Sequence, residues 1–136
     1  MRRGAGSPPG RPRRAPRDRG VASLEYLGML PFLLLVALTG IQLGLVAYCG
    51  EQAGTAARTA ARTASRPEPH ADPYQAGKDA VSGWLREDTY IENPMDDDGR
   101  KVKATAVVRI PSVLPGVHLF DPVRRSATMP KEDTTP

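Results

Sequence analysis

Residues 26–49 read YLGMLPFLLLVALTGIQLGLVAYC and contain no charged side chain. An α-helix rises about 1.5 Å per residue, so about 20 apolar residues span the roughly 30 Å hydrocarbon core of a bilayer. Secretory signal peptides have shorter apolar regions, of about 7–15 residues, followed by a cleavage site made of small residues. Because this run is longer than that, it predicts one transmembrane helix.

The segment before this run is strongly basic. Residues 1–20 contain seven arginines and one acidic residue, Asp18; since the whole chain carries +4, the remainder carries −2. Basic side chains beside a membrane helix stay in the cytoplasm, which predicts a cytoplasmic N-terminus and an extracytoplasmic C-terminus. A basic tail is also typical of nucleic-acid binding. The apolar helix that follows directly explains the arginines more simply, so no nucleic-acid partner is expected.

After Glu51 the chain has the mixed composition of a soluble protein. Residues 55–66, TAARTAARTASR, repeat every four residues. Alanine favours helix and late arginines suit the helix dipole, so the membrane helix is predicted to continue as a stalk. We expect a solvated stalk; the alternative is that its alanine face packs against a helix of another subunit. Prolines within residues 67–73 then end the helix as a hinge.

Residues 67–136 are predicted to form a small α+β domain with a flexible tail, and 21–66 the helix and stalk. Hydrophobic periodicity and turn composition define the expected elements of the domain. In chain order these are a short amphipathic helix at 74–86, a strand at 89–91, a turn at 93–99, the main strand at 102–110 and the start of a return strand at 117–120. The domain has few large apolar residues, so we expect it to lean on a helix or a partner.

A short motif joins the basic leader to the apolar run. Gly20 is followed, after four residues, by Glu25 and Tyr26. This spacing resembles the prepilin peptidase motif of the tight-adherence (Flp) pilus system, in which cleavage follows the glycine and the glutamate is fifth in the mature chain. Further segments are similar to TadE-like pseudopilins: the proline and glycine pattern of residues 30–44, the alanine–arginine continuation at 52–62, and the β-rich tail at 109–111, 114–116 and 126–129.

The resemblance implies a TadE-like minor pseudopilin, a single-pass membrane protein without catalytic activity that takes part in assembly of a Flp/Tad-type pilus or secretion apparatus. Its implied partners are the membrane, the prepilin peptidase, other pilin subunits and the assembly machinery. Gly20 offers the peptidase no side-chain obstruction. Cleavage would remove the leader and create a mostly cationic amino group on Val21. The resemblance also implies that Glu25 pairs with that amine to register subunits.

Four residues of the apolar run are interpreted as shaping or packing positions. Pro31 lacks a backbone donor and should kink or loosen the helix near residues 27–31. Gly40 and Gly44 form a small-xxx-small pair that lets another helix approach closely. Gln42 is expected to hydrogen-bond across that same contact, or to its own backbone.

No pattern indicates catalysis, and no cofactor, metal or small-molecule substrate is expected. The three aspartates before Gly99 lack the spacing of a calcium loop. Cys49, the only cysteine, is interpreted as a small apolar residue; the alternative is an intermolecular disulfide. Two other functions remain open: a membrane-tethered extracytoplasmic protein that does not polymerise, and a lipoprotein or secreted binding module. For a lipoprotein, Tyr48 is bulky where a small residue should precede the modified cysteine.

Overall fold

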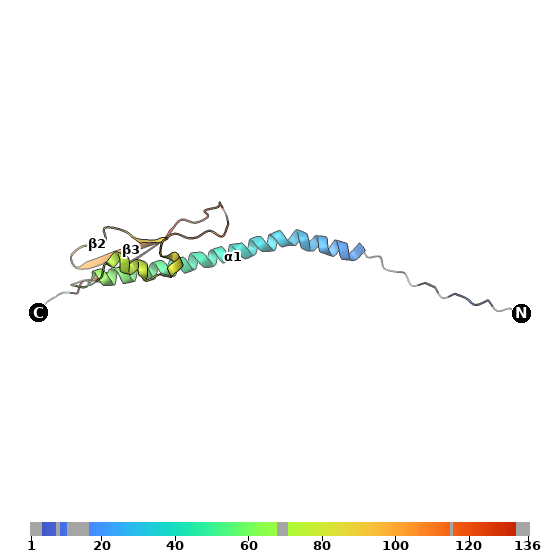
Figure 1. Cartoon of the computed structure of the whole chain (residues 1–136), viewed down its shortest axis with the longest axis horizontal. Helices are drawn as coiled ribbons and strands as arrows, with labels where there is room; N and C mark the ends of the chain where they lie inside the picture. Colours follow the sequence, from blue (N-terminus) through green and yellow to red (C-terminus); the bar gives the residue numbers. More distant parts are fainter. Residues whose placement is uncertain (1–3, 8, 11–16, 68–70, 115, 133–136) are drawn as a thin grey trace. The chain divides into compact units, whose positions relative to one another are not determined.

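The structure is a computed structural model that describes residues 4–7, 9–10, 17–67, 71–114 and 116–132 (Figure 1). The chain divides into two compact units, Met1–Val36 and Ala37–Pro136. The expected α+β class, with a long apolar helix before a short helix and a small antiparallel sheet, is confirmed. In chain order the elements are α1 (Arg17–Ala64), α2 (Pro73–Asp79), the 3₁₀-helix η1 (Gly83–Leu85), β1 (Thr89–Ile91), β2 (Asp96–Asp97), β3 (Lys101–Val108) and β4 (Val123–Pro130).

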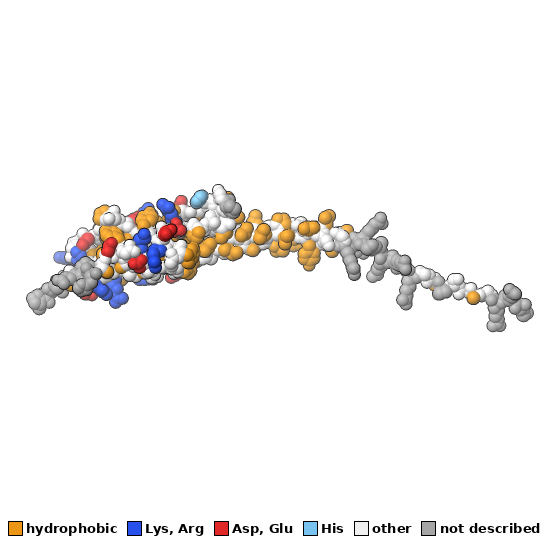
Figure 2. Space-filling model, viewed as in Figure 1, with side chains coloured by type: hydrophobic (Ala, Val, Ile, Leu, Met, Phe, Trp, Pro, Cys, Tyr) orange, Lys and Arg blue, Asp and Glu red, His pale blue; other side chains and the backbone are white. Residues whose placement is uncertain are grey.

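Helix α1 is a single helix of 48 residues that continues through Pro31 without interruption. It begins at Arg17, inside the predicted leader, and ends two residues before the predicted limit of the stalk. By length and composition it could cross a membrane. In the first unit its large apolar side chains are exposed; Phe32, for example, is 65% exposed. Figure 2 shows these hydrophobic side chains along the helix. A helix that exposes apolar residues in this way requires lipid or protein around it.

The sheet is built around β3. Strand β4 pairs antiparallel with β3 along its whole length, from Lys101↔Pro130 to Val108↔Val123. Strands β1 and β2 share the other edge, β1 beside residues 106–108 and β2 beside residues 102–103. The strand predicted at 89–91 is therefore confirmed, and the main strand lies within one or two residues of its predicted bounds.

The return strand predicted at residues 117–120 is wrong. These residues belong to an exposed loop, and β4 supplies the return strand. Pro111 and Pro122 bracket the loop and lack the backbone donor that a ladder requires, while Gly116 adopts a positive φ of 78°. Pairing therefore resumes only at Val123, the first residue after these prolines.

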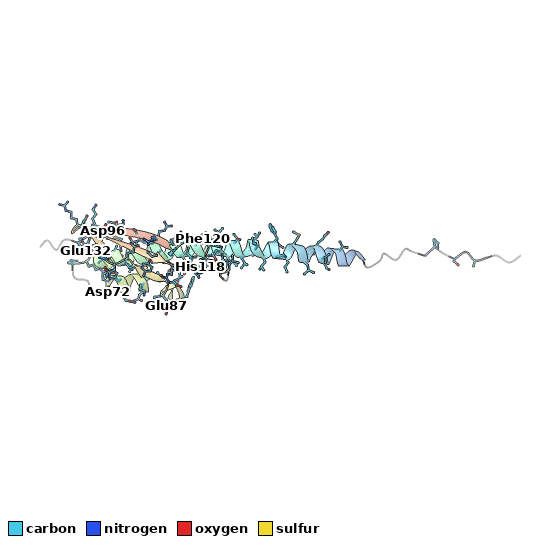
Figure 3. All side chains as sticks on the ribbon, turned by 90° about the horizontal axis from the view of Figure 1, so that it is seen from above. Asp72, Glu87, Asp96, His118, Phe120 and Glu132 are labelled. Carbon is cyan, nitrogen blue, oxygen red and sulfur yellow. The ribbon has the colours of Figure 1, made fainter. Side chains whose placement is uncertain are left out.

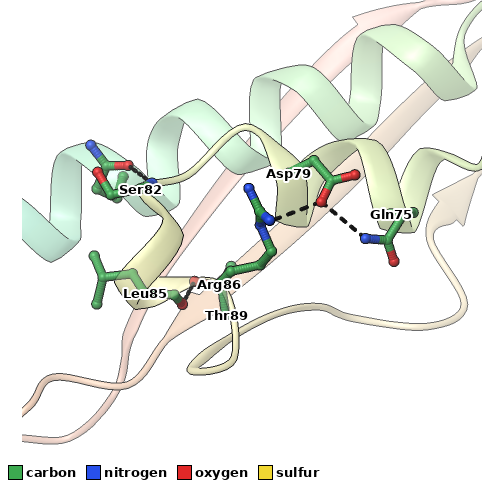
Figure 4. Close-up of polar contacts among 7 residues, drawn as sticks. Gln75, Asp79, Ser82, Leu85, Arg86 and Thr89 are labelled. Carbon is green, nitrogen blue, oxygen red and sulfur yellow. Dashed lines mark hydrogen bonds and ion pairs between the residues drawn. The ribbon is translucent and has the colours of Figure 1, made fainter.

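The amphipathic helix predicted over residues 74–86 is also wrong as a single element, because the chain divides there into α2 and η1. Asp72 caps α2 by accepting a hydrogen bond from the Tyr74 amide at 3.0 Å. Beyond α2, the Ser82 amide donates to Gln52 Oε1 of α1 at 3.0 Å, which draws the chain onto α1 (Figure 4). Gly83 follows directly, and glycine weakens helical continuation.

The turn predicted at residues 93–99 contains the short strand β2, because Asp96 and Asp97 pair with β3. Asp98 Oδ1 accepts hydrogen bonds from the amides of Arg100 and Lys101, at 2.9 and 2.7 Å. These bonds, the Arg100 amide first, hold the pKa of the Asp98 carboxyl below its usual range. Asp97 forms an ion pair with Lys131 at 2.6 Å, and its pKa is likewise lowered. The acidic cluster thus stabilises the β2–β3 hairpin.

The core of the second unit lies between α1 and the sheet. One face of α1 consists of small residues that are completely buried. The inward-facing residues of β3 cover this face. The buried helix residues are Cys49, Ala53, Ala56, Ala57, Ala60 and Ala61. The prediction of a solvated stalk is wrong for this face of α1. The alternative, packing against a helix of another subunit, is also wrong, because the face packs against the chain's own sheet. The domain leans on a helix, as expected.

Candidate functional site

The residues of the predicted processing site lie at the start of α1. Gly20 is the fourth residue of the helix and is exposed, and a Cβ at this position would meet nothing within 4 Å. Val21, which follows it, is 58% exposed. Helix ends fray, and glycine is a poor helix former. The Gly20–Val21 peptide bond thus lies near the N-terminal end of α1, where helices fray.

Glu25 lies one turn after Val21 on the same face of α1, since residues four apart in a helix are neighbours. Glu25 is exposed, and Tyr26 beside it is 79% exposed. In the uncut chain the nitrogen of Val21 is a peptide nitrogen, so the amine that Glu25 is predicted to pair with would exist only after cleavage. The four-residue spacing would place the Glu25 carboxylate close to that amine.

Part of the leader lies outside the described residues. The backbone of Arg17 and Arg19 belongs to α1. The other five leader arginines, at positions 2, 3, 11, 13 and 14, fall in the undescribed part of the chain, as do His70 and the last residues of the tail, 133–136. The charge of the leader is therefore a property read from the sequence alone.

Gly40 and Gly44 are exposed, and a Cβ at either position would meet nothing within 4 Å. The two glycines therefore form an uncovered strip on the surface of α1 in the second unit. Gln42 does not share this strip. At about 100° per residue it is turned roughly 180° away from the midpoint between the two glycines. The prediction that Gln42 hydrogen-bonds across the glycine contact is therefore wrong.

The side chain of Gln42 instead contacts the loop between β3 and β4 and is only 3% exposed. Its Nε2 donates to the carbonyl oxygen of Pro111 at 3.3 Å. Its Oε1 accepts from the amide of Val113 at 3.0 Å. Both ends of the amide are used, so Gln42 ties the loop to α1. Sequence reasoning missed this contact because the partners lie about 70 residues apart.

A second contact that sequence reasoning missed joins α1 to η1. The rings of Tyr48 and Trp84 stack with their centroids 5.9 Å apart and an interplanar angle of 7°. The Tyr48 hydroxyl hydrogen-bonds the Ser82 hydroxyl. Nearby, Arg86 forms an ion pair with Asp79, which also accepts from Gln75 (Figure 4). An aromatic pair near the end of an apolar run is typical of a membrane–water interface.

Cys49 is completely buried in the core between α1 and the sheet. A thiol in this position cannot meet a second chain without opening the core, which favours its interpretation as a small apolar residue. Cys49 also lies in the middle of α1. Cleavage before it, which lipid attachment requires, would separate the apolar run from the buried alanine face of α1.

One family model matches part of the chain. The model of TadE-like proteins matches residues 20–62. The resemblance to TadE-like proteins stated from the sequence is thereby confirmed over residues 20–62. The match supports a Tad pilus-associated protein, and the single apolar helix fits a single-pass membrane protein. No curated protein and no solved structure matches the chain.

Proposed function

We propose that this TadE-like chain is a minor pseudopilin that takes part in assembly of a Flp/Tad-type pilus or secretion apparatus. The first part of α1 spans the cell membrane, with the leader in the cytoplasm and the sheet outside it. The observation that carries the proposal is the composition of α1. Its first turns hold Gly20 and Glu25, its middle exposes apolar side chains, and its last turns form the core of the second unit.

Processing prepares the chain for assembly. A prepilin peptidase cuts after Gly20 and removes all seven leader arginines together. These cationic side chains oppose movement of the helix through the bilayer, so their removal favours extraction into a growing assembly. The new amine on Val21 is mostly protonated at neutral pH. Glu25, one turn away, then pairs with the amine of its own chain or of a neighbouring subunit, where a low dielectric strengthens the attraction.

The alternatives make different predictions about the N-terminus. A membrane-tethered protein that does not polymerise keeps its leader. A lipoprotein begins at a lipidated Cys49, and the complete burial of that residue argues against this alternative. A pseudopilin begins at Val21.

The experiment is intact-mass and N-terminal analysis of the protein from cells with an active prepilin peptidase. We expect a mature chain that begins at Val21. Gly20→Leu should slow or block cleavage, because a bulky side chain occupies the position before the scissile bond. Gly28→Leu is the matched control, since Gly28 also lies in α1 with no atom within 4 Å of a Cβ. Recovery of full-length protein alone would contradict the proposal.

A further inference from the structure

The loop between β3 and β4 extends past the sheet along α1 (Figure 1). His118 and Phe120, labelled in Figure 3, belong to this loop. The hydrogen bonds of Gln42 to the backbone at Pro111 and Val113 fix the start of the loop on the helix. Gln42 itself belongs to the uncharged run of residues 26–49. The loop is therefore attached to the segment that is proposed to lie in the bilayer.

The depth of this attachment follows from the helix rise. Counting about 20 residues from Tyr26 places the outer limit of the hydrocarbon core near Leu45. Gln42 lies three residues closer to the centre, which is about 5 Å at 1.5 Å per residue. Interfacial segments bury their apolar face by about 5–10 Å at the boundary between headgroups and acyl chains. The loop thus reaches the depth at which such segments lie.

The polar groups of the loop are largely paired among themselves. The Ser112 hydroxyl lies 2.6 Å from the Val117 carbonyl oxygen and 3.0 Å from that of Leu114, and it accepts from the Leu114 amide at 3.3 Å. The Val117 amide donates to the Leu114 carbonyl. Irregular backbone is tolerated at membrane depth only where its hydrogen bonds are satisfied. Gln42 and Ser112 supply these hydrogen bonds to backbone groups of Pro111, Val113, Leu114 and Val117.

Three large apolar side chains near the end of the loop are exposed, with the exposed His118 among them. Val117, Leu119 and Phe120 are 42%, 53% and 43% exposed, although none of residues 110–120 is an aspartate, glutamate, lysine or arginine. Charged residues begin again only at Asp121. Tyr48, three residues beyond the estimated boundary, stacks on Trp84, as expected of an aromatic pair at headgroup level.

We propose that residues 117–120 form a second membrane contact, in which Leu119 and Phe120 enter the boundary between headgroups and acyl chains of the outer leaflet. The proposal rests on the proposed membrane span of α1. The lipid surface, rather than a second protein, is the inferred occupant because Gln42 attaches the loop to the lipid-facing run itself. The contact would hold the sheet against the membrane until the subunit is extracted.

The test uses full-length protein in lipid nanodiscs, one molecule in each, in a Cys49→Ala background. An environment-sensitive nitrobenzoxadiazole probe is attached to a single cysteine at one of three exposed positions. Leu119→Cys reports on the loop, Ile41→Cys on the lipid-facing helix, and Arg100→Cys on the hairpin far along the sheet. Quenching is measured with lipids brominated at a shallow acyl position and with aqueous iodide.

We expect brominated lipid to lower the fluorescence of the probes at 119 and 41, and iodide to lower that of the probe at 100. If iodide quenches position 119 as strongly as position 100 while lipid quenches position 41, the loop proposal fails and the membrane span stands. Shielding of position 119 from both quenchers would indicate a protein contact and would also overturn it. If lipid fails to quench position 41, the proposed membrane span itself is wrong.

Discussion

At the scale of single residues, Glu25, just before the apolar run, and Gln42, within it, have different surroundings. Gln42 is almost completely buried, and both ends of its amide are hydrogen-bonded to the loop between β3 and β4. The fold therefore explains why a polar residue stands there. Glu25 is exposed on the first turns of α1. A carboxylate at a membrane boundary is costly unless it lies near headgroups or is paired, so Glu25 is the residue whose role can be tested separately from the fold.

We predict that Glu25→Gln permits cleavage after Gly20 but weakens association with other pilin subunits. The substitution removes the counter-ion of the new amine on Val21. Hydrogen bonds to charged groups contribute about 1.5–3 kcal/mol, so recovery of partners should fall roughly tenfold or more. The measurement is crosslinking and co-purification of the processed protein with its partners.

Glu51→Gln is the matched control, because Glu51 is also an exposed glutamate of α1 but lies beyond the apolar run. It should leave partner recovery unchanged. Equal recovery from the wild-type and Glu25→Gln proteins would show that Glu25 only marks the membrane edge.

At the scale of elements, α2 is held close to both α1 and β1 because it contains a glycine at the contact. A Cβ on Gly77 would lie 2.8 Å from Ile91 Cδ1 and 3.0 Å from Ala60 Cβ. Both neighbours belong to the buried core, so neither can move freely. The hydrophobic pattern could predict that α2 is amphipathic. It could not predict how close the helix comes, because that distance depends on the side chains of two other elements.

We predict that Gly77→Ala destabilises the second unit. Overpacking costs about 1–3 kcal/mol, and alanine regains about 0.5–1 kcal/mol of helix propensity. The net loss of stability should thus be about 1 kcal/mol, with an upper limit of about 2.5 kcal/mol. The buried thiol of Cys49 serves as the probe, because it reacts with a maleimide only when the core opens.

Gly83→Ala provides the comparison, since a Cβ there would meet nothing within 4 Å. Its rate of thiol labelling across a urea series should remain close to that of the wild type. An equal rate for Gly77→Ala would mean that α2 moves away from α1 without cost, contrary to the close packing described above.

At the scale of the whole molecule, the arginine-rich leader predicts the direction in which the chain crosses the membrane. Cationic residues beside the apolar run remain in the cytoplasm. A reporter enzyme that matures only outside the cytoplasm, fused after Pro136, should therefore be active. A fluorescent protein that matures only in the cytoplasm, fused at the same point, should be dark. The reverse pair of results would overturn the orientation.

The elements that depend on local composition can be predicted from the amino-acid sequence. The uncharged run of residues 26–49, the basic leader and the alternation along β3 are each visible within a short window, because membrane length, charge bias and strand periodicity are local properties. The processing motif and the family resemblance are equally local.

Only the tertiary structure decided what covers the alanine face of α1 and what Gln42 binds. Alanines spaced along one side of a helix predict a close contact, but their pattern is the same whether the contact comes from solvent-free packing against another helix or against a sheet. The sheet that covers them forms from β3 and β4, which pair across a loop bracketed by Pro111 and Pro122. Long-range pairing of this kind fixes partners far apart in the sequence, and no local pattern records it.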